Sequence, residues 1–240
     1  MFKNRFLVAL CLCFVALGCN AAEMEAGYVN VSSSVTKDVD PNRAEVVFYV
    51  ETTEKTAQEA SEKNKVLINN VINAIKTEIS SNKTDSIKTS AFVVRPDYYW
   101  TKDNKKVLNA YVATNSVYVV TSNIQNAGRI IDLAINAGAT RVDSFRLTLD
   151  NPNNYCISVL EDAVKDTQFK AGSIAKVLGT SVSSVKFINT SCSSQNSNNS
   201  PYVMMKNSKV DSTESATSAT PIEAGKIKVY ANVNASYYLK

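Results

Sequence analysis

The sequence predicts an α+β fold in which antiparallel strands pack against three amphipathic helices. Apolar and polar residues alternate over residues 44–51, 86–94 and 227–240, which is typical of strands with one buried face. Three other segments carry apolar residues at helical spacing. The 240 residues suffice for one large or two small domains. A division near Thr121 would separate a ββαββ half from an αβαβ half with a final long strand.

Residues 1–22 have the features of a signal peptide. Two cationic residues precede an apolar run over residues 7–18, which is too short to span a bilayer but long enough for a signal-peptide core. The Ala-Leu-Gly before Cys19 resembles a bacterial lipobox, in which case Cys19 would be lipidated. Ordinary cleavage after Ala21 or Ala22 is the alternative. We expect a periplasmic protein, which acyl chains on Cys19 would tether to the outer membrane.

Two strands and a long helix are expected at the start of the mature domain, residues 23–240. The strands cover residues 27–36 and 44–51. A capping box of Thr56 and Glu59 precedes the helix, whose apolar positions continue to Ile79 at helical spacing.

The stretch from Ser86 to Thr121 predicts a long antiparallel hairpin, because two strand-like runs flank a polar tip at residues 101–106. Pro96 has no N–H for the ladder, so we expect it to stop the first strand. The second run begins at Asn109 and is dense in Val, Tyr, Thr and Ala. We expect the flanking helices to bury their apolar stripes against this hairpin.

Two further helices are expected after the hairpin. Ser122 and Gln125 form a capping-box pattern before a short helix, and Gly138 follows it where a left-handed cap belongs. After a strand at residues 140–149, an Asn-Pro-Asn turn begins the third helix, which Gly179 closes. The predicted stripe of this helix consists of Ile157, Leu160, Ala163, Val164, Ala171, Ile174, Ala175 and Leu178.

The rest of the chain predicts two strands joined by a long loop. The strands cover residues 182–188 and 227–239, and the Ser- and Asn-rich stretch 192–220 between them is expected to be a flexible loop. The final strand has one apolar and one polar face, so one side should meet the core and the other water or a partner.

Cys156 and Cys192 are predicted to form a disulfide. From Cys156 the third helix runs about 33 Å to Leu178 at 1.5 Å per residue, and the chain returns about 33 Å from Val182 to Cys192. If helix and strand are antiparallel, the two sulfurs meet in an oxidising compartment. A redox-active pair is the alternative, but neither a C-x-x-C spacing nor a basic neighbourhood supports it.

Tyr98, Tyr99 and Trp100 are candidate contact residues at the tip of the hairpin. Three lysines lie beside them in the sequence, and exposed aromatic residues with cations can form a protein or membrane contact. The alternative is that the rings fold back on their own hairpin. We predict this tip as the surface for an oligomer or a partner.

The composition argues against several kinds of site. The sequence has no histidine, which excludes Ser-His-Asp, Cys-His and His-based zinc sites. Asp97, Asp103, Asp143 and Asp150 are expected to be solvated, since nothing in the sequence pairs two of them as a catalytic dyad. A formal net charge of +4 without a polybasic run makes a nucleic-acid partner unexpected. We therefore expect no catalytic residue, no metal and no cofactor.

Several segments, in order along the chain, resemble the SIMPL-domain family of exported bacterial proteins. They are residues 85–89 and 109–115, Ala137-Gly138-Ala139, Ala163-Val164 leading to Lys170-Ala171, Leu178-Gly179, and residues 220–225 before the last strand. The resemblance implies a periplasmic or outer-membrane-associated α+β protein linked to oxidative-stress protection. It further implies large ring- or channel-like oligomers for some members and surface antigens for others, with no established catalytic residue.

The leading expectation is a non-enzymatic envelope protein that self-assembles or binds partners. We expect a homo-oligomer, with other envelope proteins as further partners, no nucleic acid, and membrane contact only through a lipid anchor at Cys19. One alternative is an enzyme or small-molecule-binding protein with a pocket between the two halves. Another is a lipid-anchored structural or antigenic protein.

Overall fold

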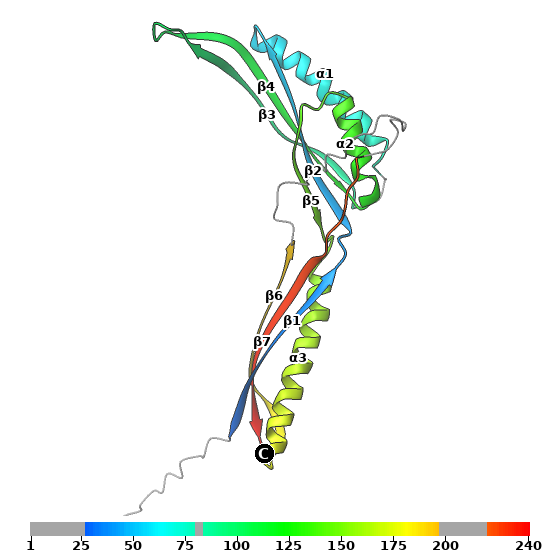
Figure 1. The fold of residues 1–240 in the computed structure, drawn as a ribbon, viewed down its shortest axis with the longest axis vertical. Helices are drawn as coiled ribbons and strands as arrows, with labels where there is room; N and C mark the ends of the chain where they lie inside the picture. The colour runs from blue at the N-terminus through cyan, green and yellow to red at the C-terminus, as the bar shows by residue number, and fades with distance from the viewer. Residues whose placement is uncertain (1–26, 80–83, 197–219) are drawn as a thin grey trace, which may run out of the picture.

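Two antiparallel sheets lie end to end in an elongated molecule (Figure 1). The computed structural model describes residues 27–79, 84–196 and 220–240. Helices and antiparallel sheets together confirm the predicted α+β class. We call the part at the top of Figure 1 the upper body and the part at the bottom the lower body.

The upper body is a four-stranded sheet covered by two helices. Its strand order is β3-β4-β2-β5, with β2 at Arg43–Glu54, β3 at Ser86–Trp100, β4 at Lys106–Thr121 and β5 at Arg141–Thr148. Helix α1 (Ala57–Lys76) lies against β2 and β4. Helix α2 (Ala127–Asn136) follows a short 3-10 turn, η1 (Ile124–Asn126), and packs beside α1.

The lower body is a three-stranded sheet with one long helix along it. Its strand order is β1-β7-β6, with β1 at Tyr28–Val39, β6 at Val182–Asn196 and β7 at Ile227–Leu239. Helix α3 (Pro152–Val177) packs against all three strands. Because β1 and β7 pair from Tyr28 opposite Tyr238 to Val39 opposite Ile227, the first and last described residues lie at the same end.

The boundary between the bodies does not fall near Thr121, where the sequence pattern predicts it. β1 belongs to the lower sheet and β2 to the upper one, so the chain first crosses between the bodies at residues 40–42. Thr121 ends β4 within the upper body. Alternation identifies the buried face of a strand but not its partner, so the pairing of β1 with β7 was not predictable. Helix α3 lies on the lower sheet, against the strand at Val182–Asn196 as the disulfide prediction assumes.

Each body has its own hydrophobic core. The upper core is built from one face of β2 and β4 and the apolar sides of α1 and α2: Val46, Phe48, Val50, Ile68, Val71, Ile75, Val117, Val119, Ile130, Ile131, Ala134 and Ala139. The lower core joins β7 to α3: Leu149, Val159, Ala163, Ala171, Ile227, Val229, Ala231, Val233, Ala235 and Tyr237. Burial alternates along β2 and β7 as the sequence predicted, so each sheet buries one face.

Helix α1 begins with the predicted capping box. The Glu59 N–H donates to the Thr56 hydroxyl at 3.2 Å, and the Thr56 N–H donates to the Glu59 carboxylate at 3.2 Å. Two amides at the start of the helix are thereby satisfied. The helix ends at Lys76, earlier than predicted, although Ile79 still packs against the upper core.

The capping box predicted at Ser122 and Gln125 is wrong. Both the N–H and the hydroxyl of Ser122 donate to the Asp85 carboxylate, at 2.7 and 2.9 Å. Asn123 instead caps η1, accepting the Asn126 N–H at 3.3 Å. A carboxylate is the stronger acceptor, so a contact with the start of β3 overrides the local pattern.

Pro96 does not stop the first strand of the hairpin. β3 continues to Trp100, and Pro96 lies opposite Tyr111. Because β3 is the edge of the upper sheet, a residue without an N–H can be placed there without breaking a second ladder.

Small side chains form most of the buried stripe of α3, and several large residues of the predicted stripe lie elsewhere. The buried positions recur every four residues: Val159, Ala163, Thr167, Ala171 and Ala175. Ile157, Ile174 and Leu178 are instead exposed. Small residues allow the helix to lie close to the sheet at native packing density. Gly179 has a φ of 70° after the helix, as the predicted left-handed cap requires.

Strand β6 is longer than predicted. It begins at Val182, but it continues to Asn196, so residues 192–196 of the predicted loop pair with β7. The rest of that loop, residues 197–219, lies outside the described residues. So do the predicted signal peptide and Cys19.

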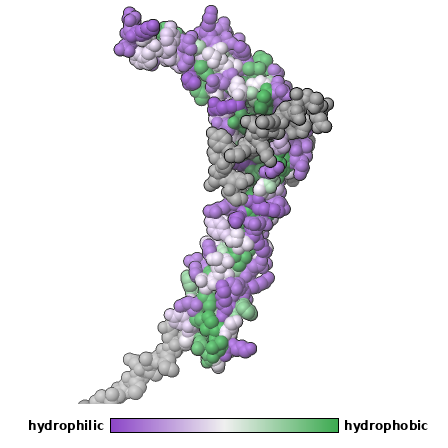
Figure 2. All heavy atoms as spheres, in the orientation of Figure 1, coloured by the Kyte–Doolittle hydropathy of each residue, from purple (hydrophilic) through white to green (hydrophobic). Residues whose placement is uncertain are grey.

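Apolar side chains are exposed on both bodies, and on the face shown in Figure 2 they gather near the lower end of the molecule. Among the residues that the structure describes, no helix has both the length and the apolar character needed to cross a bilayer.

Candidate contact surface

The end of the β3–β4 hairpin extends beyond the rest of the upper sheet (Figure 1). β2 pairs with β4 only as far as Glu54 opposite Tyr111, whereas β3 and β4 continue to pair up to Trp100 opposite Lys106. The last part of the hairpin is therefore two-stranded. Such a ribbon buries little apolar surface by itself and is marginally stable in water when isolated.

Thr101 organises the turn that closes this hairpin. Its N–H donates to the Lys105 carbonyl at 2.9 Å, and its hydroxyl accepts the Lys105 N–H at 3.2 Å. Asn104 takes a positive φ of 56°, a conformation that asparagine tolerates better than most residues. These contacts fix the direction in which the strand ends point.

We define the hairpin tip as Tyr98, Tyr99, Trp100, Lys106, Val107 and Leu108. The three aromatic side chains are 45%, 50% and 65% exposed, which argues against rings folded back onto their own strands. Tyr98 lies opposite Leu108 and Tyr99 opposite Val107. Because neighbouring residues point to opposite faces of a strand, both faces of the tip carry exposed apolar groups.

Cationic and polar groups frame the tip. The Lys106 ammonium lies 4.2 Å from the centroid of the Tyr98 ring, within the range of a cation–π interaction. The Asn109 amide donates to the Asp97 carboxylate at 2.9 Å. The tip therefore presents aromatic residues, which are enriched in protein interfaces, with a lysine beside them.

The free edge of β3 limits which strands could add to it. β3 forms the outer strand of the upper sheet, so one side of its backbone has no neighbouring strand within that sheet. Pro96 and two register shifts, at Thr89/Ala91 and at Asp97/Tyr98, interrupt this edge. Prolines and bulges protect edge strands from indiscriminate pairing, so this edge is poorly suited to the addition of a further strand.

Val107 and Leu108 belong to the tip, although the sequence pattern did not single them out. They lie between the polar residues of the turn and the predicted start of the second strand at Asn109. Their position could be predicted from the sequence, because in a hairpin that turns near residue 103 these two residues lie opposite Tyr98 and Tyr99.

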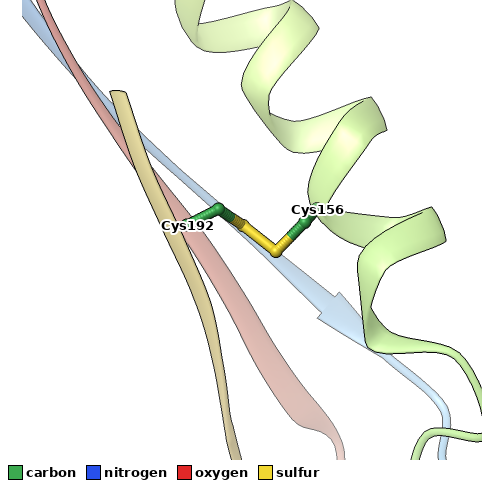
Figure 3. The surroundings of a disulfide bond; sticks show 2 residues. All are labelled: Cys156 and Cys192. Atoms are coloured by element: carbon green, nitrogen blue, oxygen red, sulfur yellow. A yellow bond between two sulfur atoms is a disulfide. The ribbon is translucent and has the colours of Figure 1, made fainter. Parts of the chain in front are cut away.

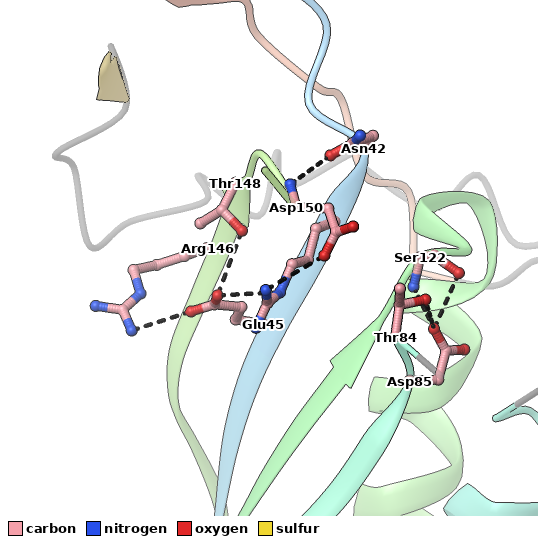
Figure 4. Close-up of polar contacts among 9 residues, drawn as sticks. Asn42, Glu45, Thr84, Asp85, Ser122, Arg146, Thr148 and Asp150 are labelled. Carbon is pink, nitrogen blue, oxygen red and sulfur yellow. Dashed lines mark hydrogen bonds and ion pairs between the residues drawn. The ribbon is translucent and has the colours of Figure 1, made fainter. Parts of the chain in front are cut away.

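A network of polar contacts lies where the two bodies meet (Figure 4). The Asn42 side chain accepts the Asp150 N–H at 2.7 Å. Arg43 lies 3.4 Å from Glu45 and 3.6 Å from Asp150. Glu45 also accepts from Arg146 at 3.2 Å and from Thr148 at 3.3 Å. These contacts hold the start of β2 against the end of β5.

A hollow of about 300 Å³ opens at this junction, lined by Asn42, Arg43, Thr84, Ser122 and Asp150. It corresponds to the pocket expected if the chain were an enzyme. Asp150 lies near Arg43, and Asp85 accepts two hydrogen bonds from Ser122, so these carboxylates serve to hold backbone segments together. Across residues 27–79, 84–196 and 220–240, no three Cys, Asp or Glu side chains converge as ligands for a metal ion would.

Tyr118, on β4, lies beside this network. Its burial, together with a hydrogen bond to Glu45 and the negative charge of that residue, raises its pKa above the ordinary value. The phenol therefore stays protonated at neutral pH, as a hydrogen-bond donor rather than a base.

Cys156 and Cys192 are joined by a disulfide (Figure 3). Their Cα atoms are 5.8 Å apart, Cys156 lies near the start of α3, and Cys192 lies on β6 opposite Ala231. The bond therefore ties the helix to an edge strand of the lower sheet. The helix and the strand run antiparallel, as the prediction of this pair assumes.

In a comparison with known proteins, one family model matches almost all of the described fold. The model of SIMPL, described as a protein of unknown function (DUF541), matches residues 29–237, from β1 into β7. The uncharacterized protein YggE of Edwardsiella ictaluri (strain 93-146) is 23% identical over 172 residues, which is 71% of this chain and 71% of that protein. Both bodies are thus part of the similarity.

Proposed function

Because the chain belongs to the SIMPL family, whose function is unknown, we propose that it is a non-enzymatic exported protein that assembles with copies of itself through the hairpin tip. The signal-peptide features of residues 1–22 support export to the periplasm. Lipidation of Cys19 would tether the protein to the outer membrane. A contribution to oxidative-stress tolerance is the role that the family resemblance implies.

The exposed hairpin tip is the observation that carries this proposal. Tyr98, Tyr99 and Trp100 stand on a two-stranded ribbon beyond the end of β2. Tyrosine and tryptophan are enriched among residues that dominate binding energy in interfaces. An apolar ribbon with both faces exposed is stabilised when a partner covers it.

A non-enzymatic role accords with the polar groups of the junction. Asp85 and Glu45 each accept hydrogen bonds from neighbouring side chains or backbone. A general acid or base needs instead to reach a substrate proton. We therefore propose that the polar contacts of the junction keep each subunit of the assembly rigid.

The assembly is tested with a triple variant, Tyr98→Ser/Tyr99→Ser/Trp100→Ser. Light scattering coupled to size-exclusion chromatography should show a multimer for the unaltered protein and a monomer for the variant. Its thermal unfolding should change little, because these side chains are exposed and lie outside both hydrophobic cores.

The matched control is Val66→Ser/Ile157→Ser/Phe169→Ser, which removes three apolar side chains that are 60%, 59% and 74% exposed on helices. This control should keep the multimer. A monomeric unaltered protein at high concentration would overturn self-assembly. A tip variant that stays multimeric would overturn the role of the hairpin tip.

A further inference from the structure

We propose that the end of the lower body opposite the hairpin tip is a docking surface for the headgroup region of an anionic phospholipid bilayer. This contact is separate from any lipid on Cys19 and from self-assembly through the hairpin tip. It is formed by the lower-end patch, which we define as Tyr28, Val177, Leu178, Val185 and Phe187.

The lower-end patch is apolar and exposed. Val177, Leu178 and Phe187 are 87%, 61% and 57% exposed, and Tyr28 and Val185 are close to half exposed. The space-filling view shows apolar side chains gathered in this part of the lower body (Figure 2). A group of exposed apolar residues at one end of a folded protein indicates a surface that contacts a membrane or another protein.

Backbone contacts bring the patch residues to one end of the molecule. Val177 ends α3, and the chain soon enters β6 at Val182, which lies opposite Leu239. Ser181 and Lys240 exchange backbone hydrogen bonds of 2.9 and 2.8 Å. Tyr28 lies opposite Tyr238 on the other side of β7. The helix end, both edge strands and the central strand therefore all meet here.

The described segments at this end carry lysines, whose ammonium groups suit anionic headgroups. Lys176, Lys186 and Lys240 lie on the segments that meet here, and residues 27–37, 167–196 and 227–240 contain neither Asp nor Glu. Lysines attract anionic headgroups when they are held close to a bilayer surface. The lysine side chains of these described segments thus place cationic groups around the apolar patch, while Glu23 and Glu25 precede Gly27 in the sequence.

Aromatic and cationic side chains are stacked at this end. The Lys186 ammonium lies 3.7 Å from the centroid of the Tyr28 ring and 5.5 Å from that of Tyr238. The side chains of tyrosine and lysine each combine an apolar part with a polar end, so both suit the interface between lipid and water. The patch thus has the composition of an interfacial contact.

The position of Gly27, the first described residue, agrees with this orientation. The described chain begins at Gly27, whose carbonyl accepts the Leu239 N–H at 2.8 Å at this same end. Cys19 precedes Gly27 by eight residues (27 − 19 = 8), which span at most about 28 Å when extended. An acyl chain on Cys19 would hold this end, and not the hairpin tip, within reach of the bilayer.

A second copy of the chain suits the patch less well. If two identical patches met about a two-fold axis, each would face its own copy, and the lysines of one would lie against the lysines of the other. Like charges brought together across an interface oppose association. A phosphate-rich surface supplies the opposite charge and accommodates the apolar residues among the headgroups.

The test uses the protein with Cys19→Ser in every sample, so that no acyl chain contributes. Vesicles of phosphatidylethanolamine and phosphatidylglycerol are added, and the bound fraction is measured by sedimentation. Val177→Ser/Leu178→Ser/Phe187→Ser should weaken the partition coefficient by about tenfold or more. The control Val66→Ser/Phe92→Ser/Ile157→Ser removes similarly exposed apolar groups elsewhere and should bind as before.

Tryptophan fluorescence determines which end binds, because Trp100 is the single tryptophan of the chain and lies on the hairpin tip. Adding vesicles should leave its emission unchanged. In a Trp100→Phe/Phe187→Trp protein, the emission should shift to shorter wavelength and be quenched by brominated lipid. Absence of vesicle binding, or a shift of Trp100 alone, would overturn the proposal. So would patch variants that lose self-association while still binding vesicles.

Discussion

At some positions, neighbouring backbone packs so closely that a larger side chain cannot be accommodated. Gly128 lies buried in α2, and a Cβ atom there would be 1.9 Å from the Thr220 carbonyl oxygen. Thr220 cannot easily move, because its N–H and hydroxyl donate to Asp132 at 2.9 and 2.6 Å. The absent side chain therefore lets the segment before β7 lie across α2.

We predict that Gly128→Ala and Gly172→Ala change stability in opposite directions. Gly128→Ala should lower the free energy of unfolding by about 1–3 kcal/mol, because the new methyl overlaps backbone. Gly172 lies in α3, and a methyl group on its Cα would meet no neighbouring atom within 4 Å. Gly172→Ala should therefore raise the free energy of unfolding by about 0.5–1 kcal/mol through helix propensity. Urea unfolding measures both, and equal effects would contradict the assignment.

Asn64 shows why the sequence could not specify every buried position. It is fully buried on α1 four residues before Ile68, at a position where an apolar residue would continue the stripe. Its amide donates to the carbonyls of Val50 and Ala113 at 2.8 and 2.9 Å. Those acceptors come from two different strands, so only the tertiary structure explains a buried amide here.

At the scale of elements, the disulfide restrains the lower body. We predict that Cys156→Ala/Cys192→Ala lowers the free energy of unfolding by about 4 kcal/mol, since the bond joins residues 36 positions apart and so closes a loop in the unfolded chain. Urea unfolding of the variant and of the unaltered protein under reducing conditions should agree. A loss below about 1 kcal/mol would mean that the reduced unfolded chain is already restrained.

Two ion pairs of α3, one with Lys37 of β1 and one within the helix, should make stability depend on pH. Hydrogen bonding and charge from Lys37 lower the pKa of Asp162, and Lys170 lowers that of Asp166. A carboxyl with a lowered folded-state pKa stabilises the fold above its unfolded-state pKa of about 4. This stabilisation should be lost as the pH falls through the lower folded-state value.

The measurement is the urea midpoint between about pH 2 and pH 6. Asp162→Asn/Asp166→Asn should make the decline toward low pH shallower, because the variant has no such carboxyls to protonate. Asp103→Asn, in the hairpin turn, should leave the slope unchanged. An identical slope for all three proteins would contradict the contribution of these pairs.

Strand and helix positions followed from the sequence, whereas their mutual arrangement did not. The alternation of β7 and the capping box of α1 depend on neighbours along the chain, and both predictions are confirmed. The buried face of α3 depends on how closely β7 approaches it, so the prediction is wrong for Ile157, Ile174 and Leu178, which are exposed. The cross-strand partners of Tyr98 and Tyr99 depend on where the hairpin turns and not on the alternation within either strand.

At the scale of the whole molecule, two cores placed end to end determine its dimensions. A compact chain of 240 residues has a radius of gyration of about 18 Å. We predict a clearly larger value by small-angle X-ray scattering of the monomeric hairpin-tip variant, with an asymmetric distance distribution. A value near 18 Å would show that the bodies fold against each other in solution.

The position of β7 between β1 and β6 determines when the lower sheet can form during biosynthesis. Neither outer strand can acquire its ladder until the 13 residues of β7 have left the ribosome. Contacts between such distant parts of a chain form slowly. β1 thus stays without its partner until β7 has been synthesised, long after all four strands of the upper sheet.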